Sequence, residues 1–569
     1  MGKKMSREEK NSILKNRKIY LCGDLRCCRD FEYIFDDTYI VDKVLIKEVA
    51  RLKELVEEEF VVICSFNQES VSLQLKELGL QYGRHYAYAN DFFELLDFDI
   101  AEATSGKHIF LWGAGANAVN VLEKFEGVRA IIDSDRAKTG GRIDNIEIVH
   151  PDDIDDEEWK NLFIVVSCEG YYYEIKKILQ EKGLKEKKNF VKWGNVNAAS
   201  KMLEKTFYDT NYFDLCCESC FRVYEVETNG DVSACCTTLI RGRIGNLLDD
   251  SFWDVWESNL HKIQCLSLNN RSFSFCIPTS CPALINRKTC DVTDELAEKL
   301  VYKKFIGRPE YLHLSIDKTC NLYCESCREK IEIANGQCLE KANILKKKIL
   351  SAGIQDIKSV LLAGNGEVFL SKTYEEIWRH EIVNNANVIR VQTNGMLLTP
   401  KRWEEFYVGK ENADIWVYVS IDAATAETYE QVRRGGNFEV LKKNMEFAAS
   451  LRKSGKIKYF RINFVVQRKN YLEMERFIEW GLELGVDNVF FTKILNWGTY
   501  TEQEFDEITM MDKNDVPKPE FAEILERDIF KNKIVDLGTI QYKKNRKIPT
   551  YVDNYYEWET RDWMENNRE

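Results

Sequence analysis

The sequence has no apolar run of 18 residues, no excess of positive charge and no cysteine after Cys338. The first absence excludes a membrane-spanning helix. The net charge of −13, with both signs interspersed, argues against a basic nucleic-acid-binding face and therefore against a tRNA-modifying enzyme. The last absence restricts cysteine-based metal chemistry to the part of the chain before Leu339.

Composition favours a folded protein with several domains. At 569 residues the chain is long enough for three or more domains, and 44% apolar residues support folded cores throughout. The first ten residues are charged and lack the apolar stretch of a signal peptide, so we expect a cytoplasmic location. In that compartment, 18 cysteines grouped at ligand spacing indicate metal clusters rather than disulfides.

Three cysteines, Cys320, Cys324 and Cys327, stand in the spacing C-x3-C-x2-C. Three thiolates hold three irons of a four-iron, four-sulfur cube, whereas proteins that only carry electrons normally use four cysteines. The triad therefore predicts a [4Fe–4S] cluster with one iron kept open for chemistry. A structural zinc site is the alternative for the spacing taken alone.

The region around the triad alternates strand-like and helix-like segments. Residues 311–316 alternate in polarity and lead into the cysteines. Five more apolar runs follow, at residues 359–363, 389–392, 416–421, 459–466 and 488–494. The segments between them are long enough for crossovers, and several have helical periodicity, which predicts a parallel sheet. Six such units predict a partial (β/α)6 barrel, with reactive groups at the C-terminal ends of the strands.

Polar and glycine-rich turns follow the predicted strands. The second strand is followed by Gly364-Asn-Gly-Glu367 and the third by Thr393-Asn-Gly395. Ser420 and Asp422 end the fourth strand and lie on one face at period two, although Asp422 is also a possible N-cap for the next helix. Arg433 or its neighbour Arg434 can clamp a carboxylate bidentately.

The triad and these turns together resemble the radical S-adenosylmethionine (SAM) superfamily. In that family SAM chelates the open iron, and an electron from the cluster splits it into methionine and a 5′-deoxyadenosyl radical that abstracts hydrogen from a substrate. Two positions depart from the family pattern: Ser326 replaces an aromatic residue and Val368 replaces a proline, which leaves the adenine contacts open. The resemblance implies SAM-binding roles for Gly364, Gly366, Glu367, Asn394, Ser420, Asp422 and Arg433.

A second group of cysteines precedes the triad. Cys220 is followed by nine residues, Gly230, four residues and Cys235, and a predicted hairpin with an Asn-Gly turn brings the two cysteines together. This pattern resembles the SPASM auxiliary-cluster domain, although that domain commonly follows the barrel. Zinc is the alternative metal, and Cys217, Cys236 and Cys290 are alternative ligands. The resemblance implies a second [4Fe–4S] cluster on Cys220, Cys235, Cys276 and Cys281.

The N-terminal part has a different pattern. Gly113-x-Gly115-x-x-Ala118 follows a β-rich run, and Asp133 follows the next one, which matches the Rossmann fingerprint for a nucleotide. A bound nucleotide and a module that kept the fold without its ligand both remain open. Residues 18–89 resemble a diverged copy that serves as a scaffold or recognition element. Its Cys22, Cys27 and Cys28 are not expected to bind metal, because no partner cysteine or histidine clusters near them.

We therefore predict an α/β multidomain chain. The segments are a diverged Rossmann-like half (1–105), a Rossmann-like module (106–198), a SPASM-like domain (199–300), a partial (β/α)6 radical SAM barrel (301–500) and a C-terminal extension (501–569).

The resemblance implies a radical SAM enzyme that oxidises a peptide or protein through its auxiliary cluster. An external donor such as flavodoxin or ferredoxin would supply the electrons, and neither nucleic acid nor membrane is expected as a partner. A sugar or glycan precursor is the alternative substrate. A non-enzymatic redox-sensing or zinc-binding scaffold is the third hypothesis. The sequence identifies no catalytic acid or base.

Overall fold

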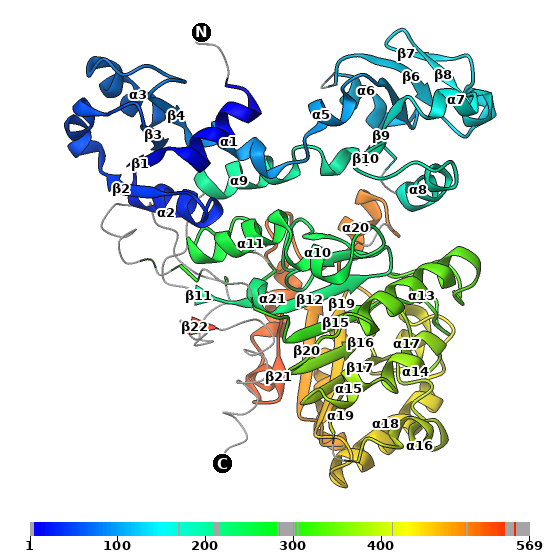
Figure 1. Cartoon of the computed structure of the whole chain (residues 1–569). Coiled ribbons are helices and arrows are strands. Elements are labelled where there is room, and N and C mark those ends of the chain that lie inside the picture. Colours follow the sequence, from blue (N-terminus) through cyan, green and yellow to red (C-terminus); the bar gives the residue numbers. More distant parts are fainter. Residues whose placement is uncertain are drawn as a thin grey trace. The chain divides into compact units, whose positions relative to one another are not determined.

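The computed structural model divides into two compact units, Met1–Asp209 with Val292–Tyr302, and Thr210–Asp291 with Lys303–Glu569 (Figure 1). It describes residues 5–540, except 124, 169–170, 209–215, 279, 282–283, 285–299, 301, 304–306, 412 and 497–498, together with residues 551–552. Within these residues no helix has both the length and the apolar character needed to cross a bilayer.

The first unit starts with a four-stranded parallel sheet in the order β2-β1-β3-β4. β3 is buried along almost its whole length, as expected of a parallel strand covered on both faces. The strands are β1 (Lys18–Gly23), β2 (Ile40–Val44), β3 (Glu59–Cys64) and β4 (Tyr86–Tyr88). The helices are α1 (Arg7–Asn16), α2 (Leu25–Ile34), α3 (Gln68–Glu77), α4 (Ala89–Phe93) and α5 (Ile100–Thr104).

A partner cysteine does lie near the cysteines of this first sheet. The thiol of Cys64, at the end of β3, is hydrogen-bonded to that of Cys28 on α2. The expectation that no partner cysteine is close was therefore wrong, because adjacent parallel strands bring together residues that are far apart in the sequence. All four thiols, those of Cys22, Cys27, Cys28 and Cys64, are fully buried.

The same unit contains a six-stranded sheet in the order β10-β9-β5-β6-β8-β7, parallel except for the β7–β8 hairpin. The predicted strand, glycine turn and helix are present as β5, Gly113–Gly115 and α6. The strands are β5 (His108–Trp112), β6 (Val128–Ile132), β7 (Arg142–Ile143), β8 (Ile146–Val149), β9 (Leu162–Val166) and β10 (Phe190–Lys192). The helices are α6 (Ala116–Leu122), α7 (Asp156–Trp159), α8 (Tyr172–Glu181) and α9 (Ala198–Tyr208).

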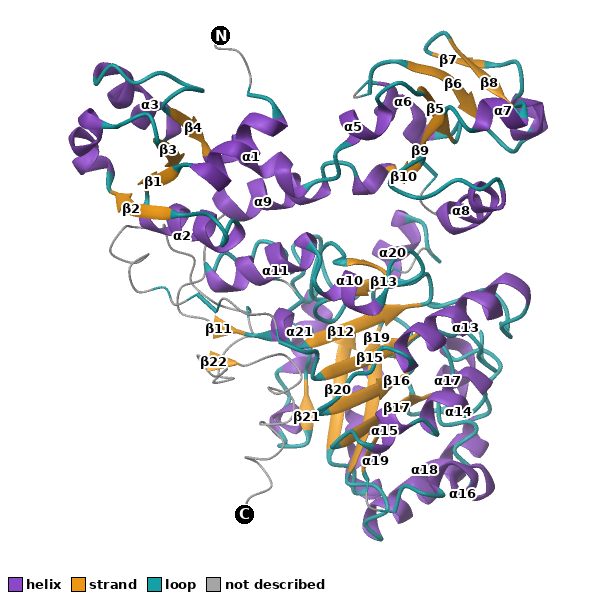
Figure 2. Ribbon diagram, viewed as in Figure 1, coloured by secondary structure: helices purple, strands orange, loops and turns teal. Residues whose placement is uncertain are grey.

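The second unit is built on one ten-stranded sheet, β14-β13-β12-β15-β16-β17-β18-β19-β20-β21 (Figure 2). The six strands from β15 to β20 are parallel and in sequence order, which confirms the predicted repeat of strand and crossover. They are β15 (Tyr311–Ser315), β16 (Ser359–Leu362), β17 (Val388–Thr393), β18 (Asp414–Ser420), β19 (Tyr459–Val466) and β20 (Asn488–Lys493). At the far edge β21 (Val535–Asp536) adds a short parallel strand to β20.

The cysteine-rich segment upstream extends this same sheet. β12 (Val223–Glu227) pairs in parallel with β15 along its whole length, and β13 (Asp231–Ser233) and β14 (Gly245–Asn246) follow as antiparallel neighbours. A short pair, β11 (Cys216–Cys217) and β22 (Tyr551–Val552), stands apart from it. The sequence did not predict that the cysteine-rich hairpin and the barrel share one sheet.

Helices cover one face of the ten-stranded sheet. Phe477 of α19 packs against Phe464 and Phe491, and Phe252 of α10 stacks on Tyr224. The helices of this unit are α10 (Phe252–Trp256), α11 (Asn259–Asn269), α13 (Gly336–Leu350), α14 (Lys372–Trp378), α15 (Glu381–Asn384), α16 (Pro400–Tyr407), α17 (Ala426–Val432), α18 (Phe438–Lys453), α19 (Met474–Leu484), α20 (Glu502–Ile508) and α21 (Pro519–Leu525).

The opposite face, called the inner face below, carries polar and aromatic residues. Successive residues of a strand point to opposite faces, so the residues that alternate with those under the helices lie here. Arg461 stacks on the rings of Tyr418 and Phe490, with its guanidinium carbon 3.8 Å and 4.5 Å from the ring centres. In strand order the inner face includes Glu225, His313, Leu361, Arg390, Trp416, Tyr418, Arg461 and Asn463.

Candidate functional site

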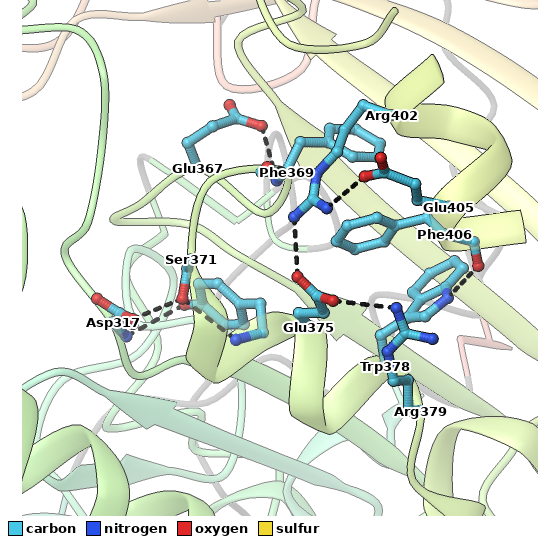
Figure 3. Close-up of polar contacts among 11 residues, drawn as sticks. Asp317, Glu367, Phe369, Ser371, Glu375, Trp378, Arg379, Arg402, Glu405 and Phe406 are labelled. Carbon is cyan, nitrogen blue, oxygen red and sulfur yellow. Dashed lines mark hydrogen bonds and ion pairs between the residues drawn. The ribbon is translucent and has the colours of Figure 1, made fainter. Parts of the chain in front are cut away.

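Cys320, Cys324 and Cys327 lie on the loop that follows β15, and Asp317 anchors the start of this loop. One carboxylate oxygen of Asp317 accepts the backbone N–H of Thr319 at 2.8 Å. The other accepts the Ser371 hydroxyl at 2.5 Å, as Figure 3 shows. Ser371 is the N-cap of α14, so the second strand–helix unit fixes where the cysteine loop begins.

Each of the three triad sulfurs faces a side-chain nitrogen. The pairs are Cys320 Sγ with Asn394 Nδ2 at 3.7 Å, Cys324 Sγ with Arg433 Nη1 at 3.6 Å, and Cys327 Sγ with Arg328 Nη2 at 3.4 Å. Donors and cations next to sulfur favour the thiolate, which is the form that binds metal. The donor set of this loop therefore fits an iron–sulfur cluster.

Burial has the opposite effect on two of these thiols. It raises the pKa of Cys320 to about 11 and also raises the pKa of Cys324, where Arg433 counteracts it. Buried thiols become good ligands when a bound cation supplies the missing charge. Within the described residues no group of three or more Cys, His, Asp and Glu side chains is arranged to hold a single metal ion.

The turn Gly364–Glu367 packs against the cysteine loop. Gly366 has no room for a side chain, since a Cβ there would collide with the Asp317 carbonyl oxygen and would also lie 3.0 Å from the Thr319 carbonyl oxygen. Gly366 thus packs closely against the cysteine loop, and its predicted role in binding SAM stays a prediction. The Glu367 carboxylate is fully buried and accepts the N–H of Phe369 at 3.1 Å, the Thr393 hydroxyl at 2.7 Å and the N–H of Asn394 at 2.7 Å.

Glu367 thus connects the turns that follow the second and third strands. Burial raises its pKa, and the three hydrogen bonds counteract that rise. Asn394, held by this carboxylate, is the residue whose amide reaches Cys320. The predicted contact of Glu367 with the SAM amine stays a prediction.

Asp422 and Arg433 form a buried ion pair, with 2.6 Å between Oδ2 and Nη2. The other carboxylate oxygen of Asp422 accepts the N–H of Val465 at 2.7 Å. The N-cap of α17 is Thr425, so the alternative role of Asp422 as a helix cap was wrong. Asp422 has a φ of +66°, which means that the extended strand ends before it and that its orientation does not follow from period two.

Ser420 and the two adjacent arginines, Arg433 and Arg434, lie in different surroundings. Ser420 ends β18, half-buried, and pairs in register with Asn463 of β19. Arg434 is 39% exposed and pairs with Glu325, whereas the Arg433 side chain is 13% exposed. Of the two predicted clamps, Arg433 is therefore the one that lies among the site residues.

Several buried polar atoms near the ends of β18 and β19 have no hydrogen-bond partner within the described part of the chain. They are Arg433 Nε, Tyr429 Oη, Asn463 Oδ1 and Gln467 Oε1. Leaving such a group unpaired costs about 1–3 kcal/mol, so groups of this kind mark a place for a ligand or water. The mixture of one cationic donor, a hydroxyl and two amide carbonyls fits a molecule with a carboxylate and hydroxyl groups, as SAM has.

The upstream cysteines converge through backbone pairing. Cys220 precedes β12 and Cys235 follows β13, so the hairpin brings both cysteines to its open end. An isolated bridge pairs Ile240 with Cys276, and the N–H of Cys281 bonds to the carbonyl of Ile277. Burial raises the pKa of Cys235, and the neighbouring thiolates Cys220, Cys217, Cys236 and Cys281 raise it further.

The ligand choice within this cluster stays a prediction. Cys217 and Cys236 lie close enough to Cys235 to interact with it electrostatically, as the alternative ligand sets require. The third alternative ligand, Cys290, is outside the described residues.

In the N-terminal module the acidic residue of the fingerprint is held by its own turn. Asp133 accepts the N–H of Ala114 at 2.9 Å and pairs with Lys138 at 3.0 Å, and these contacts lower its pKa against the opposing effect of burial. Gly113 has a φ of +118°, and a Cβ there would meet Ser167 at 2.8 Å. Nucleotide binding by this module stays a prediction.

Two segments match known protein families. Residues 216–282 match the SPASM iron–sulfur cluster-binding domain, and residues 105–190 match a family described as C2185-like, N-terminal. The first match lies on the segment that carries Cys220, Cys235, Cys276 and Cys281. It identifies that segment as an iron–sulfur domain and favours iron–sulfur over zinc there.

Curated relatives match a shorter part of the chain. A probable GTP 3′,8-cyclase of Saccharolobus islandicus is 29% identical over 184 residues, which is 32% of this chain and 56% of that protein. The probable cyclase of Sulfurisphaera tokodaii is 26% identical over 183 residues, 32% of this chain and 54% of the relative. The chain thus spans about half the length of these relatives.

Two solved structures are similar in part. Streptococcus suis SuiB bound to its precursor peptide SuiA is 14% identical with a TM-score of 0.31, covering 44% of this chain and 49% of SuiB. Native anSMEcpe with bound AdoMet is 20% identical with a TM-score of 0.28, covering 38% and 58%. TM-scores this low give no basis for transferring a ligand or substrate.

Together, the SPASM match and the cyclase relatives confirm the resemblance to SPASM-type radical SAM enzymes that the sequence predicted. The cofactors that go with it are SAM and iron–sulfur clusters.

Sequence reasoning missed four residues of this region. Glu473 accepts the N–H groups of residues 424 and 425 at 2.6 Å and 3.1 Å, and Asn470 donates to the carbonyls of Asp422 and Val465, both at 2.9 Å. Glu225 and His313 pair across β12 and β15 at 2.8 Å. No sequence motif marks these residues, because each of them contacts residues that are distant in the sequence.

Proposed function

We propose that this chain is a radical SAM enzyme that abstracts hydrogen from a peptide or protein substrate and oxidises it with help from an auxiliary cluster. The observation that carries the proposal is the triad loop, in which each sulfur meets a nitrogen donor. One of those donors, Arg433, is also paired with Asp422 at the barrel's strand ends. The SPASM segment supports the auxiliary cluster.

When bound, a reduced [4Fe–4S] cluster supplies the electron that splits SAM into methionine and a 5′-deoxyadenosyl radical. The chain's own residues hold and orient the reactants. Cys320, Cys324 and Cys327 are the proposed iron ligands, and Asn394 and Arg433 stabilise two of the sulfurs as thiolates. Proteins use this kind of positioning to convert an unfavourable encounter into an intramolecular one.

Arg433 has a second role in the proposal. Its Nε is buried without a partner within the described residues, and a planar guanidinium can bind a carboxylate through a second edge. Asp422 fixes the guanidinium so that this edge stays in place. We assign the SAM carboxylate to Arg433, and the SAM hydroxyl groups to Ser420 and the unpaired amide oxygens of Asn463 and Gln467.

The test is anaerobic SAM cleavage by the reconstituted protein with dithionite as reductant, with methionine and 5′-deoxyadenosine as the measured products. Wild type should form both in equal amounts. Arg433→Lys keeps the charge but loses the planar fork, and we expect at least about tenfold weaker SAM binding by equilibrium dialysis. Arg434→Lys is the matched control and should bind SAM as wild type does. SAM binding that is equally weak in both variants would contradict the assignment of Arg433, and an absence of cleavage by wild type would contradict the proposed function.

A further inference from the structure

Glu225 and His313 form a side-chain pair between the cysteine-rich hairpin and the first barrel strand. The two residues are register partners across β12 and β15, and His313 Nδ1 lies 2.8 Å from Glu225 Oε2. Glu225 is 3% exposed, and both side chains lie on the inner face. A carboxylate from the iron–sulfur domain thus reaches into the barrel.

The pair lies between the two predicted cofactor regions. The other oxygen of Glu225 accepts the N–H of Thr237 at 3.3 Å, and Thr237 follows Cys235 by two residues. On the other side, a Cβ added at Gly364 would lie 3.8 Å from His313 Nε2. Glu225 therefore contacts the auxiliary cysteine loop, and His313 faces the turn that we assign to SAM.

The hydrogen bond to Glu225 sets which nitrogen of the imidazole carries the proton in the neutral ring. An ionised carboxylate only accepts hydrogen bonds, so His313 Nδ1 carries the proton and Nε2 of the neutral ring is a base. Among the described residues, Glu225 and Glu227 are the carboxylates of β12 on the inner face, and Glu227 is paired with Arg243 at 3.1 Å. On the other side, β16 presents Leu361, and Arg390 of β17 lies beyond it.

We propose that His313 is the general base of the reaction and that Glu225 is its positioning residue. This inference rests on the proposed function and names a residue for it. The substrate carbon, after losing a hydrogen atom to the 5′-deoxyadenosyl radical, bears a neighbouring O–H or N–H group. That carbon radical gives one electron to the auxiliary iron–sulfur cluster, the O–H or N–H bond breaks, its proton passes to His313 Nε2, and a C=O or C=N bond forms.

The proposal predicts that reduction of the auxiliary cluster and protonation of His313 are linked, because the added negative charge favours the imidazolium. This link can be measured without a substrate. The starting protein is the full chain with Cys320, Cys324 and Cys327 replaced by alanine, which leaves the auxiliary cluster alone. Its midpoint potential is followed by EPR between about pH 6 and pH 8.

We expect the potential to fall with rising pH by up to about 59 mV per unit, the value for one proton per electron. His313→Gln should remove this slope. Glu225→Gln removes the carboxylate that holds His313 Nδ1 and should weaken this slope. His380→Gln, a change at the other end of the strands, should keep the slope of the starting protein.

An equal slope with and without His313, a potential independent of pH in the starting protein, or the absence of an auxiliary-cluster signal would each overturn the proposal. Because the triad is absent from these proteins, the result is separate from the SAM-cleavage test, and failure of either can be recognised.

Discussion

Replacing Arg433 with methionine should destabilise the protein through the carboxylate that it leaves behind. Asp422 is 6% exposed and keeps one partner, the Val465 N–H at 2.7 Å, when the 2.6 Å ion pair is lost. Removing one member of a buried ion pair costs about 3–5 kcal/mol. Because the backbone bond remains and the carboxyl can take up a proton, we expect a loss of about 3 kcal/mol.

The loss should depend on pH. Burial already raises the pKa of Asp422, and Arg433 counteracts this rise together with the Val465 N–H. In Arg433→Met the folded-state pKa therefore rises further above the unfolded value. A carboxyl with a raised folded pKa binds protons more tightly in the native state, so its contribution to stability falls as pH rises through that pKa. The variant should thus lose more stability at about pH 8 than at about pH 5.

The measurement is equilibrium urea unfolding of the metal-free protein at both pH values, followed by tryptophan fluorescence. Asp422→Asn combined with Arg433→Met removes the stranded charge and should recover about 1–2 kcal/mol relative to the single variant. Arg434→Met, at a half-exposed side chain, should change stability by less than about 0.5 kcal/mol. A pH-independent loss, or a double variant no more stable than Arg433→Met, would show that an unpaired Asp422 carboxylate does not cause the loss.

Two further substitutions test the surrounding loops. Gly366→Ala drives a methyl group into the Asp317 carbonyl oxygen and should lower both the melting temperature and the iron content. Gly115→Ala, with nothing within 4 Å, should change neither. Scanning fluorimetry and iron assay would contradict this if the two variants behave alike. Glu473→Gln weakens the hydrogen bonds to the N–H groups of residues 424–425 and should cost about 1–3 kcal/mol in stability and weaken SAM binding. Unchanged SAM affinity by equilibrium dialysis would show that this loop does not position the ligand.

The strands and the triad could be predicted because their signals are local. The six barrel strands are apolar runs separated by helical segments, and the observed strands β15 to β20 begin and end within about two residues of the predicted runs. The spacing of Cys320, Cys324 and Cys327 is likewise a feature of one short loop.

The parts that could not be predicted depend on tertiary pairing or on a single backbone angle. Glu225 and His313 are 88 residues apart and meet because β12 joins the barrel sheet. Asp422 adopts a φ of +66°, so extrapolating strand periodicity to it failed. Gly366 is required by its close approach to the Asp317 carbonyl oxygen, a constraint that a turn motif alone does not reveal.

We expect the chain to hold two independent four-iron clusters, one on the triad and one on the upstream cysteines. Iron and sulfide counting with EPR, under anaerobic conditions, tests it on wild type and on a variant with Cys320, Cys324 and Cys327 changed to alanine. We predict about eight irons in wild type and about four in the variant. About four irons falling to none would contradict the account, because the upstream cysteines would then hold no iron cluster.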